Sequence, residues 1–96
     1  MSVLHVVMMT AGASTVAMEA ALADVSALRV LPGVEWLHAG PDTSIEGLQN
    51  GYTHVIVVSF ATPADRDAYL RHPSHVAAGA RLGAAISSLA IVDLAI

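Results

Sequence analysis

Runs of β-branched and apolar residues predict four strands in this chain, at residues 3–10, 34–40, 52–61 and 88–96. Successive side chains of a strand point to opposite faces. One face of the first run therefore carries Val3, His5, Val7 and Met9. One face of the third run carries Tyr52, His54, Ile56, Val58 and Phe60. The second and third runs are separated by a polar segment, 41–51, whose Asn50-Gly51 is typical of a turn.

The segment between the first two strands has the signals of a helix. Ser14 or Thr15 can cap its start, and Pro32-Gly33 ends it after about Leu31. We expect its apolar stripe to comprise Val16, Ala20, Ala23, Ala27 and Val30.

The segment between the last two strands predicts two helices with a break between them. Thr62 stands at the N-cap and Pro63 at the first helical position of a helix that carries Tyr69. A residue before proline is pushed toward an extended backbone, so this helix ends at His72. A new helix then begins at Pro73 and runs through Ala84.

The predicted order is strand, helix, strand, strand, broken helix, strand. It indicates an α+β class, a ferredoxin-like βαββαβ fold with a four-stranded antiparallel sheet. The first and third strands are expected at the centre of the sheet, with both helical segments on one face. The length of 96 residues fits a single domain, 1–96.

Composition adds a second expectation, because 55% of the residues are hydrophobic and only 12% are charged. Two helices cover one face of the sheet, yet both faces of the central strands are mainly apolar, and monomers avoid exposing such patches. We therefore expect a homodimer with sheet-on-sheet packing, which would form a dimeric α+β barrel. The alternative is a buried module of a larger complex.

Charge and segment lengths exclude several classes of partner. The net charge is −4 and the basic residues are four arginines without lysine, so no basic stripe exists for nucleic acid or an acidic membrane. The apolar run 82–92 is too short to span a bilayer, and the N-terminal run has no basic residue before it. These features predict a cytoplasmic protein, and the arginine and alanine usage suggests a bacterial source.

Two motifs carry a family resemblance across nearly the whole chain. They are Gly51-Tyr52-Thr53-His54 with the strand that follows, and the segment Tyr69-Leu70-Arg71-His72-Pro73-Ser74-His75-Val76. Supporting positions are His5, Pro32-Gly33-Val34 and Ile91-Val92-Asp93. Together they resemble the stress-responsive A/B barrel (Dabb) family of dimeric α+β barrels.

The resemblance implies an activity, because a plant member of that family is a polyketide cyclase. That enzyme closes a linear poly-β-keto thioester by an intramolecular aldol condensation, without metal or organic cofactor. By resemblance, Tyr69 and His75 would be the catalytic pair, and His5 and His54 would line the pocket. We expect no cofactor, no metal and a small hydrophobic or polyketide-like ligand.

The residue types suit this chemistry, which needs a base for an acidic α-proton and a donor to the oxyanion. His75 lies near the start of a helix, where the dipole favours neutral imidazole, and the break at Pro73 lets it converge with Tyr69. Additional candidate ligand contacts are His72, Val7, Trp36 and Ile56.

Structural readings of the same residues stay open. Tyr69 could only fill the gap between helix and sheet, His75 could lie on the surface, and His5 and His54 could be ordinary strand residues. His72 suits a helix cap, and Trp36 suits core or interface packing.

The sequence supports three functions, in this order of preference: a cofactor-free cyclase or lyase, a non-catalytic ligand-binding or stress-responsive dimer, and a cofactor-independent monooxygenase.

Overall fold

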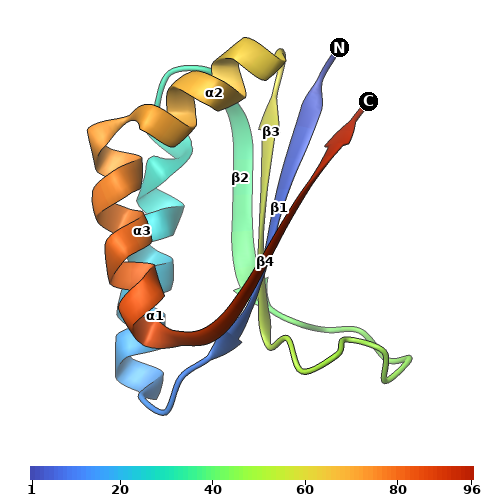
Figure 1. Ribbon diagram of the computed structural model, residues 1–96, viewed down its shortest axis with the longest axis vertical. Coiled ribbons are helices and arrows are strands. Elements are labelled where there is room, and N and C mark those ends of the chain that lie inside the picture. The colour runs from blue at the N-terminus through green and yellow to red at the C-terminus, as the bar shows by residue number, and fades with distance from the viewer.

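The computed structural model describes residues 1–96 and has the predicted order of elements (Figure 1). The strands are β1 (Val3–Ala11), β2 (Val34–Pro41), β3 (His54–Phe60) and β4 (Ile86–Ala95). The helices are α1 (Thr15–Ser26), the short 3-10 helix η1 (Ala27–Val30), α2 (Pro63–Arg71) and α3 (Pro73–Ala85).

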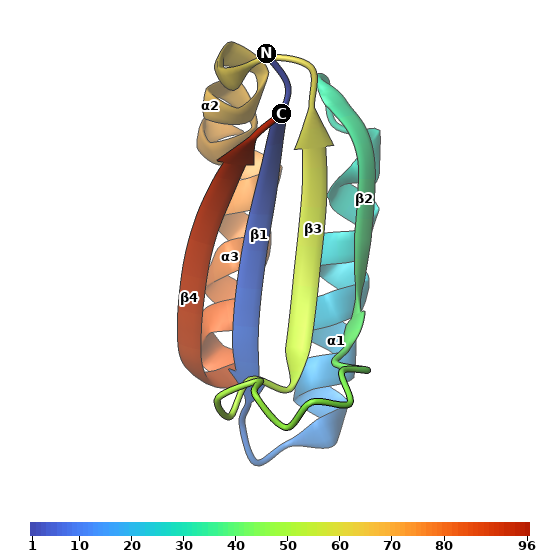
Figure 2. The same ribbon diagram turned by 90° about the vertical axis from the view of Figure 1, so that its right-hand side faces the viewer.

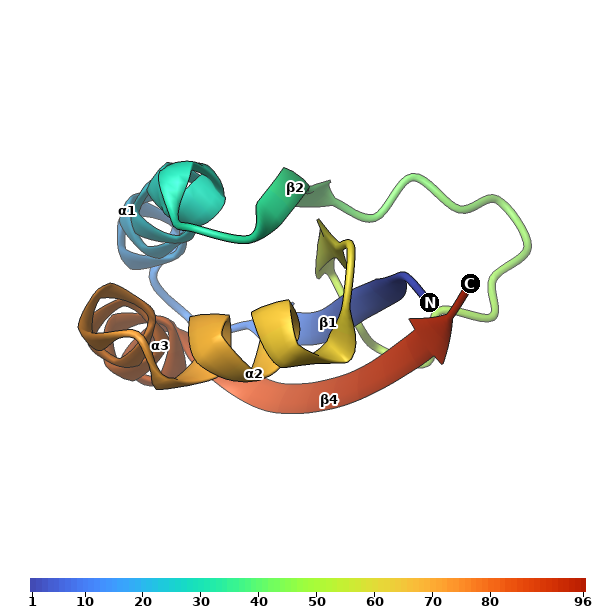
Figure 3. The same ribbon diagram turned by 90° about the horizontal axis from the view of Figure 1, so that it is seen from above.

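The strands form one antiparallel sheet in the order β2-β3-β1-β4 (Figure 2). The two central strands are β1 and β3, and all the helices lie on one face of the sheet (Figure 3). The predicted ferredoxin-like α+β fold is therefore confirmed. The opposite face has no helix over it, and we call it the open face.

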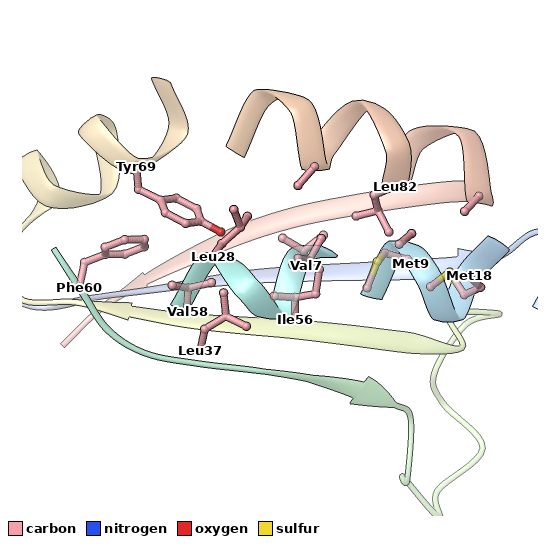
Figure 4. Close-up of a cluster of buried hydrophobic side chains, with 14 residues drawn as sticks. Val7, Met9, Met18, Leu28, Leu37, Ile56, Val58, Phe60, Tyr69 and Leu82 are labelled. Atoms are coloured by element: carbon pink, nitrogen blue, oxygen red, sulfur yellow. The ribbon is translucent and has the colours of Figure 1, made fainter. Parts of the chain in front are cut away.

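The core lies between the helices and the sheet (Figure 4). The strands contribute the alternating residues that were predicted to share a face: Val3, Val7 and Met9 from β1, and Ile56, Val58 and Phe60 from β3. The helices contribute Met18, Ala21, Val25, Leu28, Tyr69, Ala78, Leu82 and Ala85. Many of the helix residues are small, so space remains between the two layers.

The predicted first helix is partly wrong. The α-helix ends at Ser26 and continues only as the 3-10 turn η1. Its buried stripe is Met18, Ala21, Val25 and Leu28, whereas Val16 and Val30 are 77% and 80% exposed. Alanine is compatible with any face of a helix, so the larger buried residues Met18, Val25 and Leu28 decide which face packs on the sheet.

None of the helices combines the length and apolar character that a membrane crossing requires.

The third strand begins at His54, later than predicted, although Thr53 before it still bonds to the segments on both sides. The Thr53 N–H donates to the carbonyl oxygen of Met9 at 2.8 Å and its carbonyl accepts from Asp42 N–H at 2.8 Å. Asn50 and Gly51 before it have positive φ angles of 56° and 83°, which confirms the predicted turn. The segment between β2 and β3 extends beyond the open face (Figure 1).

The predicted break at Pro73 is confirmed, and His72 serves both adjoining helices. Its backbone is extended, with φ −62° and ψ 134°, and its N–H donates to the carbonyl of Tyr69 at 3.1 Å. Its Nδ1 accepts from the Ser74 N–H at 3.1 Å, which caps the start of α3. The change of direction brings the first turn of α3 beside the last turn of α2.

Candidate functional site

An apolar cavity of about 150 Å³ lies between the sheet and the helices. It is lined from β1, β3 and β4 by His5, Val7, Ile56, Val58, Leu89 and Ile91, and from α1 and η1 by Val25 and Leu28. The remaining lining comes from α2, α3 and the start of β4: Tyr69, Leu70, His75, Gly79, Leu82, Gly83 and Ile86. Its hydrogen-bonding side chains are His5, Tyr69 and His75, which makes the cavity an apolar chamber with a few convergent polar groups, the common form of a small-ligand site.

Tyr69 extends from the last turns of α2 into the space between the layers (Figure 4). The residue is only 3% exposed, and its ring packs on Phe60 with centroids 5.0 Å apart. Its hydroxyl makes no hydrogen bond with the protein, and its oxygen is not fully enclosed by protein atoms. The hydroxyl is therefore available to a ligand in the cavity.

His75 lies beside Tyr69, with ring centroids 4.7 Å apart. Its Nδ1 is 3.1 Å from the carbonyl oxygen of Leu70. A carbonyl only accepts hydrogen bonds, so Nδ1 carries the proton and Nε2 of the neutral ring is left with a free lone pair. Tyr69 and His75 thus combine a donor and an acceptor, and the predicted convergence of these two residues is present.

His5 brings a second imidazole to the same end of the cavity, with its ring 6.4 Å from that of Tyr69. The residue is 4% exposed, and its Nδ1 lies 2.7 Å from Oδ1 of Asp93 on the adjacent strand. The second oxygen of Asp93, Oδ2, accepts from Nη1 of Arg66 at 2.9 Å. Arg66 also reaches Asp67, at 3.1 Å. Both oxygens of Asp93 are thereby engaged, and the carboxylate orients His5.

Burial sets the protonation of the Tyr69–His75 pair. It raises the pKa of the Tyr69 hydroxyl to about 12, so the phenol stays a donor at neutral pH. It also lowers the pKa of His75; the hydrogen bond to Leu70 opposes this shift, and the nearby His5 adds to it. Neutral pH therefore presents a protonated phenol beside an unprotonated imidazole.

Three of the residues expected to contact ligand do not line this cavity. His54 lies at the start of β3, four residues or about 13 Å along the strand from Val58, and its Nδ1 pairs with the Thr53 hydroxyl at 2.8 Å. His54 instead borders a separate depression beside the segment that joins β2 and β3. His72 caps the start of α3, which is the structural role that the sequence suggested for it. Trp36 lies on the open face beside His38, with ring centroids 5.5 Å apart.

Other expected contacts do come together, since His5, Val7 and Ile56 all border the cavity. Asp93 and Arg66 also belong to the site, through His5, although no pattern in the sequence indicated this. The placement of Asp93 opposite His5 could be derived from the antiparallel register of β1 and β4, once these strands are known to be neighbours. No cluster of three or more His, Asp or Glu side chains is positioned to share a metal.

Comparison with known proteins agrees with this architecture. The stress responsive A/B barrel domain family, Dabb, matches residues 3–96, and the chain belongs to that family. Olivetolic acid cyclase of Cannabis sativa is 29% identical over 55 residues. That match covers 57% of this chain and 54% of the cyclase, so it spans about half of the relative's length.

Solved structures with the same fold include both enzymes and proteins without an assigned function. A dimeric ferredoxin-like protein of unknown function from Jannaschia sp. has a TM-score of 0.89 at 27% identity, covering 100% of both chains. Hydroxynitrile lyase from Passiflora edulis has a TM-score of 0.89 at 20% identity, covering 99% of this chain and 93% of the lyase. A cofactor-independent oxygenase from Streptomyces nogalater shares the fold at 14% identity, with a TM-score of 0.80 and coverage of 99% and 92%.

Proposed function

We propose that this protein is a cofactor-free cyclase or lyase acting on a β-keto, polyketide-like substrate. The observation that carries the proposal is the Tyr69–His75 pair at one end of an apolar cavity. In this pair a buried phenol without a protein partner stands beside an imidazole whose Nε2 is free. Kinship with olivetolic acid cyclase supports an aldol closure as the reaction type.

The proposed reaction begins with proton transfer to Nε2 of His75 from a carbon between two carbonyls. The electron pair of the broken C–H bond passes into an enolate, whose oxygen accepts a hydrogen bond from Tyr69. The enolate carbon attacks a distal ketone of the same molecule and forms the new C–C bond. This bond closes the ring. The imidazolium then returns its proton to the resulting alkoxide, and loss of water from the cyclic aldol forms the C=C bond of the product. No oxidant or reductant is consumed.

Incubation with a linear triketo acyl thioester of N-acetylcysteamine tests the proposal, with mass spectrometry to detect the cyclised and dehydrated product. The His75→Gln variant is expected to lose about 10²–10⁴-fold in rate, as for a general base. The Tyr69→Phe variant is expected to lose about 10²–10³-fold, as for one oxyanion donor. Matched controls are His38→Gln and Tyr52→Phe, which change the same residue types outside the cavity.

The outcomes separate the candidate functions. Full activity in both cavity variants would overturn the proposed roles. Stabilisation of the protein by the thioester against heat, with no product, would favour the non-catalytic binding protein instead. The oxygenase has no support from Trp36, the single tryptophan of the chain, because Trp36 lies on the open face and does not line the cavity.

We also propose that the open face forms a homodimer interface by sheet-on-sheet packing. Its side chains are largely apolar: Leu4, Val6, Met8, Trp36, Val55, Val57, Ala90, Val92 and Leu94. Trp36, Val92 and Leu94 are 42%, 55% and 57% exposed in the single chain. Structural neighbours described as dimeric ferredoxin-like proteins support this assembly. The cytoplasmic location stays a prediction.

A further inference from the structure

The segment that joins β2 and β3, residues 42–53, stands at one end of the open face, and we call it the arm (Figure 2). It projects from the sheet on the side opposite the helices (Figure 1, Figure 3). Its base is fixed by hydrogen bonds: the Asp42 N–H donates to the Thr53 carbonyl at 2.8 Å, and the Thr10 hydroxyl donates to the Gly51 carbonyl at 2.9 Å. The arm is therefore held on the sheet by polar contacts.

Two large apolar side chains of the arm take no part in the folding of their own chain. Ile45 is 98% exposed and Leu48 is 77% exposed. Neither residue belongs to the hydrophobic core or packs against it. Single apolar residues are ordinary on a protein surface, whereas a continuous apolar patch marks an interaction site. Whether these two residues mark such a site depends on the surface that they adjoin.

A groove of about 310 Å³ lies between the arm and the open face. Two of its lining residues, Met8 and Val55, are paired apolar residues of the open face, and Leu48 borders the groove from the arm. The other lining residues are more polar: Asp42, Ser44, Glu46, Gln49, Tyr52 and His54. Apolar residues bordered by polar ones are typical of protein–protein interfaces. The apolar surface of the open face thus continues onto the arm through Leu48.

The position of the arm favours a second copy of this chain as its partner. In the proposed homodimer the open face packs against the same face of another protomer, and stacked sheets lie about 10 Å apart. Because the arm projects beyond the open face, it would stand alongside the partner's sheet (Figure 3). The two-fold symmetry of such a contact gives the partner's arm the equivalent position. A protein described as dimeric matches 100% of this chain at 27% identity, which supports this assembly.

We propose that the arm is a clasp for a second copy of this chain. Ile45 and Leu48 pack on the partner protomer, and the groove beside Leu48 receives side chains of that protomer. The dimer thereby buries the apolar side chains of two arms in addition to the two open faces, and this burial stabilises the assembly. The inference rests on the homodimer proposed above and is independent of the proposed cyclase reaction.

A double variant, Ile45→Ser with Leu48→Ser, tests the clasp by analytical ultracentrifugation over a dilution series. The dissociation constant of the dimer is expected to rise by at least about 100-fold, because the dimer loses the burial of four large aliphatic side chains. Val16→Ser with Val30→Ser is the matched control, since these residues are 77% and 80% exposed on the helical side. The control should leave the dissociation constant unchanged.

A spin label on the arm tests the contact directly. The chain contains no cysteine, so Thr43→Cys carries a nitroxide at one position and leaves Ile45 and Leu48 intact. In dimers of this labelled chain with an unlabelled ¹⁵N-enriched chain, the nitroxide is expected to broaden amide signals of the ¹⁵N-enriched partner. A label at Val16→Cys, on the helical side, should leave those signals at full intensity.

The outcomes separate the clasp from the other proposals. Full signal intensity with the Thr43→Cys label, or an unchanged dissociation constant in the Ile45 and Leu48 double variant, would overturn the clasp and leave the arm free for a different partner. Loss of the dimer in Val92→Asp would still support the sheet interface in that case. A protein that is monomeric at every concentration would overturn the homodimer and the clasp together, whereas cyclisation of the thioester would still support the proposed reaction.

Discussion

The chemistry of the candidate site depends on the way in which two histidines are held. Each uses Nδ1 for a protein partner, the Leu70 carbonyl for His75 and the Asp93 carboxylate for His5. In each neutral ring the proton is thereby fixed on Nδ1 and Nε2 is left without one. The partner of His75 is a neutral backbone carbonyl, and burial lowers the pKa of His75, which suits this residue to the role of base.

The lowered pKa of His75 predicts the acid limb of the activity profile. The base must be unprotonated, so the rate should rise with pH through a midpoint below 6.5 and then stay level until the Tyr69 phenol ionises at about 12. Rate measurements on the triketo thioester and NMR titration of the His75 ring protons should give the same midpoint. His38→Gln should leave the profile unchanged. A midpoint at or above 6.5 would contradict the role of burial.

The same shift predicts a dependence of stability on pH. The folded protein holds the His75 proton less tightly than the unfolded chain does, so below pH 6.5 the unfolded state binds more protons. The free energy of unfolding should therefore decrease as the pH falls from 6.5 through the lowered pKa. Urea denaturation at several pH values should show that His75→Gln lacks this component. An equal slope in both proteins would exclude the linkage.

Among the elements, α2 and β4 are joined through the pair of Arg66 and Asp93. Arg66 stands one turn before Tyr69, so the helix that supplies the phenol also reaches the carboxylate that orients His5. Asp93→Ala should cost about 1–3 kcal/mol, because it leaves a buried imidazole N–H without its acceptor. Arg66→Met should cost much less, since its contact is exposed and the His5–Asp93 bond remains.

Urea denaturation checks this ranking, and ¹⁵N NMR of the His5 ring supplies a readout of position. The ring should keep its proton on Nδ1 in Arg66→Met and lose that preference in Asp93→Ala. A mixture of tautomers in the unaltered protein would argue against the orienting role of Asp93.

Elements with strong local signals were predictable from the sequence. The Thr62-Pro63 start and the His72-Pro73 break depend on proline and on capping, which act within a few residues, and both are where they were predicted. The orientation of α1 was not predictable, because an alanine-rich helix has no strongly apolar face. The position of His54 outside the cavity was also not predictable. The alternation of side chains places His54 on the face of the sheet that borders the cavity, but it does not give the distance from His54 to the cavity along β3.

For the whole molecule, the excess of apolar residues is divided between two places. One share lines the cavity under the small residues of α1 and α3, and the other covers the open face of the sheet. The two shares are separated by the sheet itself. Assembly and ligand binding should therefore respond to different substitutions.

The open face gives the prediction for the whole molecule. Val92 stands beside Val6 on that face and is 55% exposed, so a charge there would be buried without a partner in the proposed dimer. Val92→Asp should shift sedimentation from a dimer to a monomer of about half the mass. Val30→Asp is the matched control, because Val30 is 80% exposed on the helical side and should leave the dimer intact. A monomeric unaltered protein, or a Val92→Asp variant that remains dimeric, would exclude the open face as the interface.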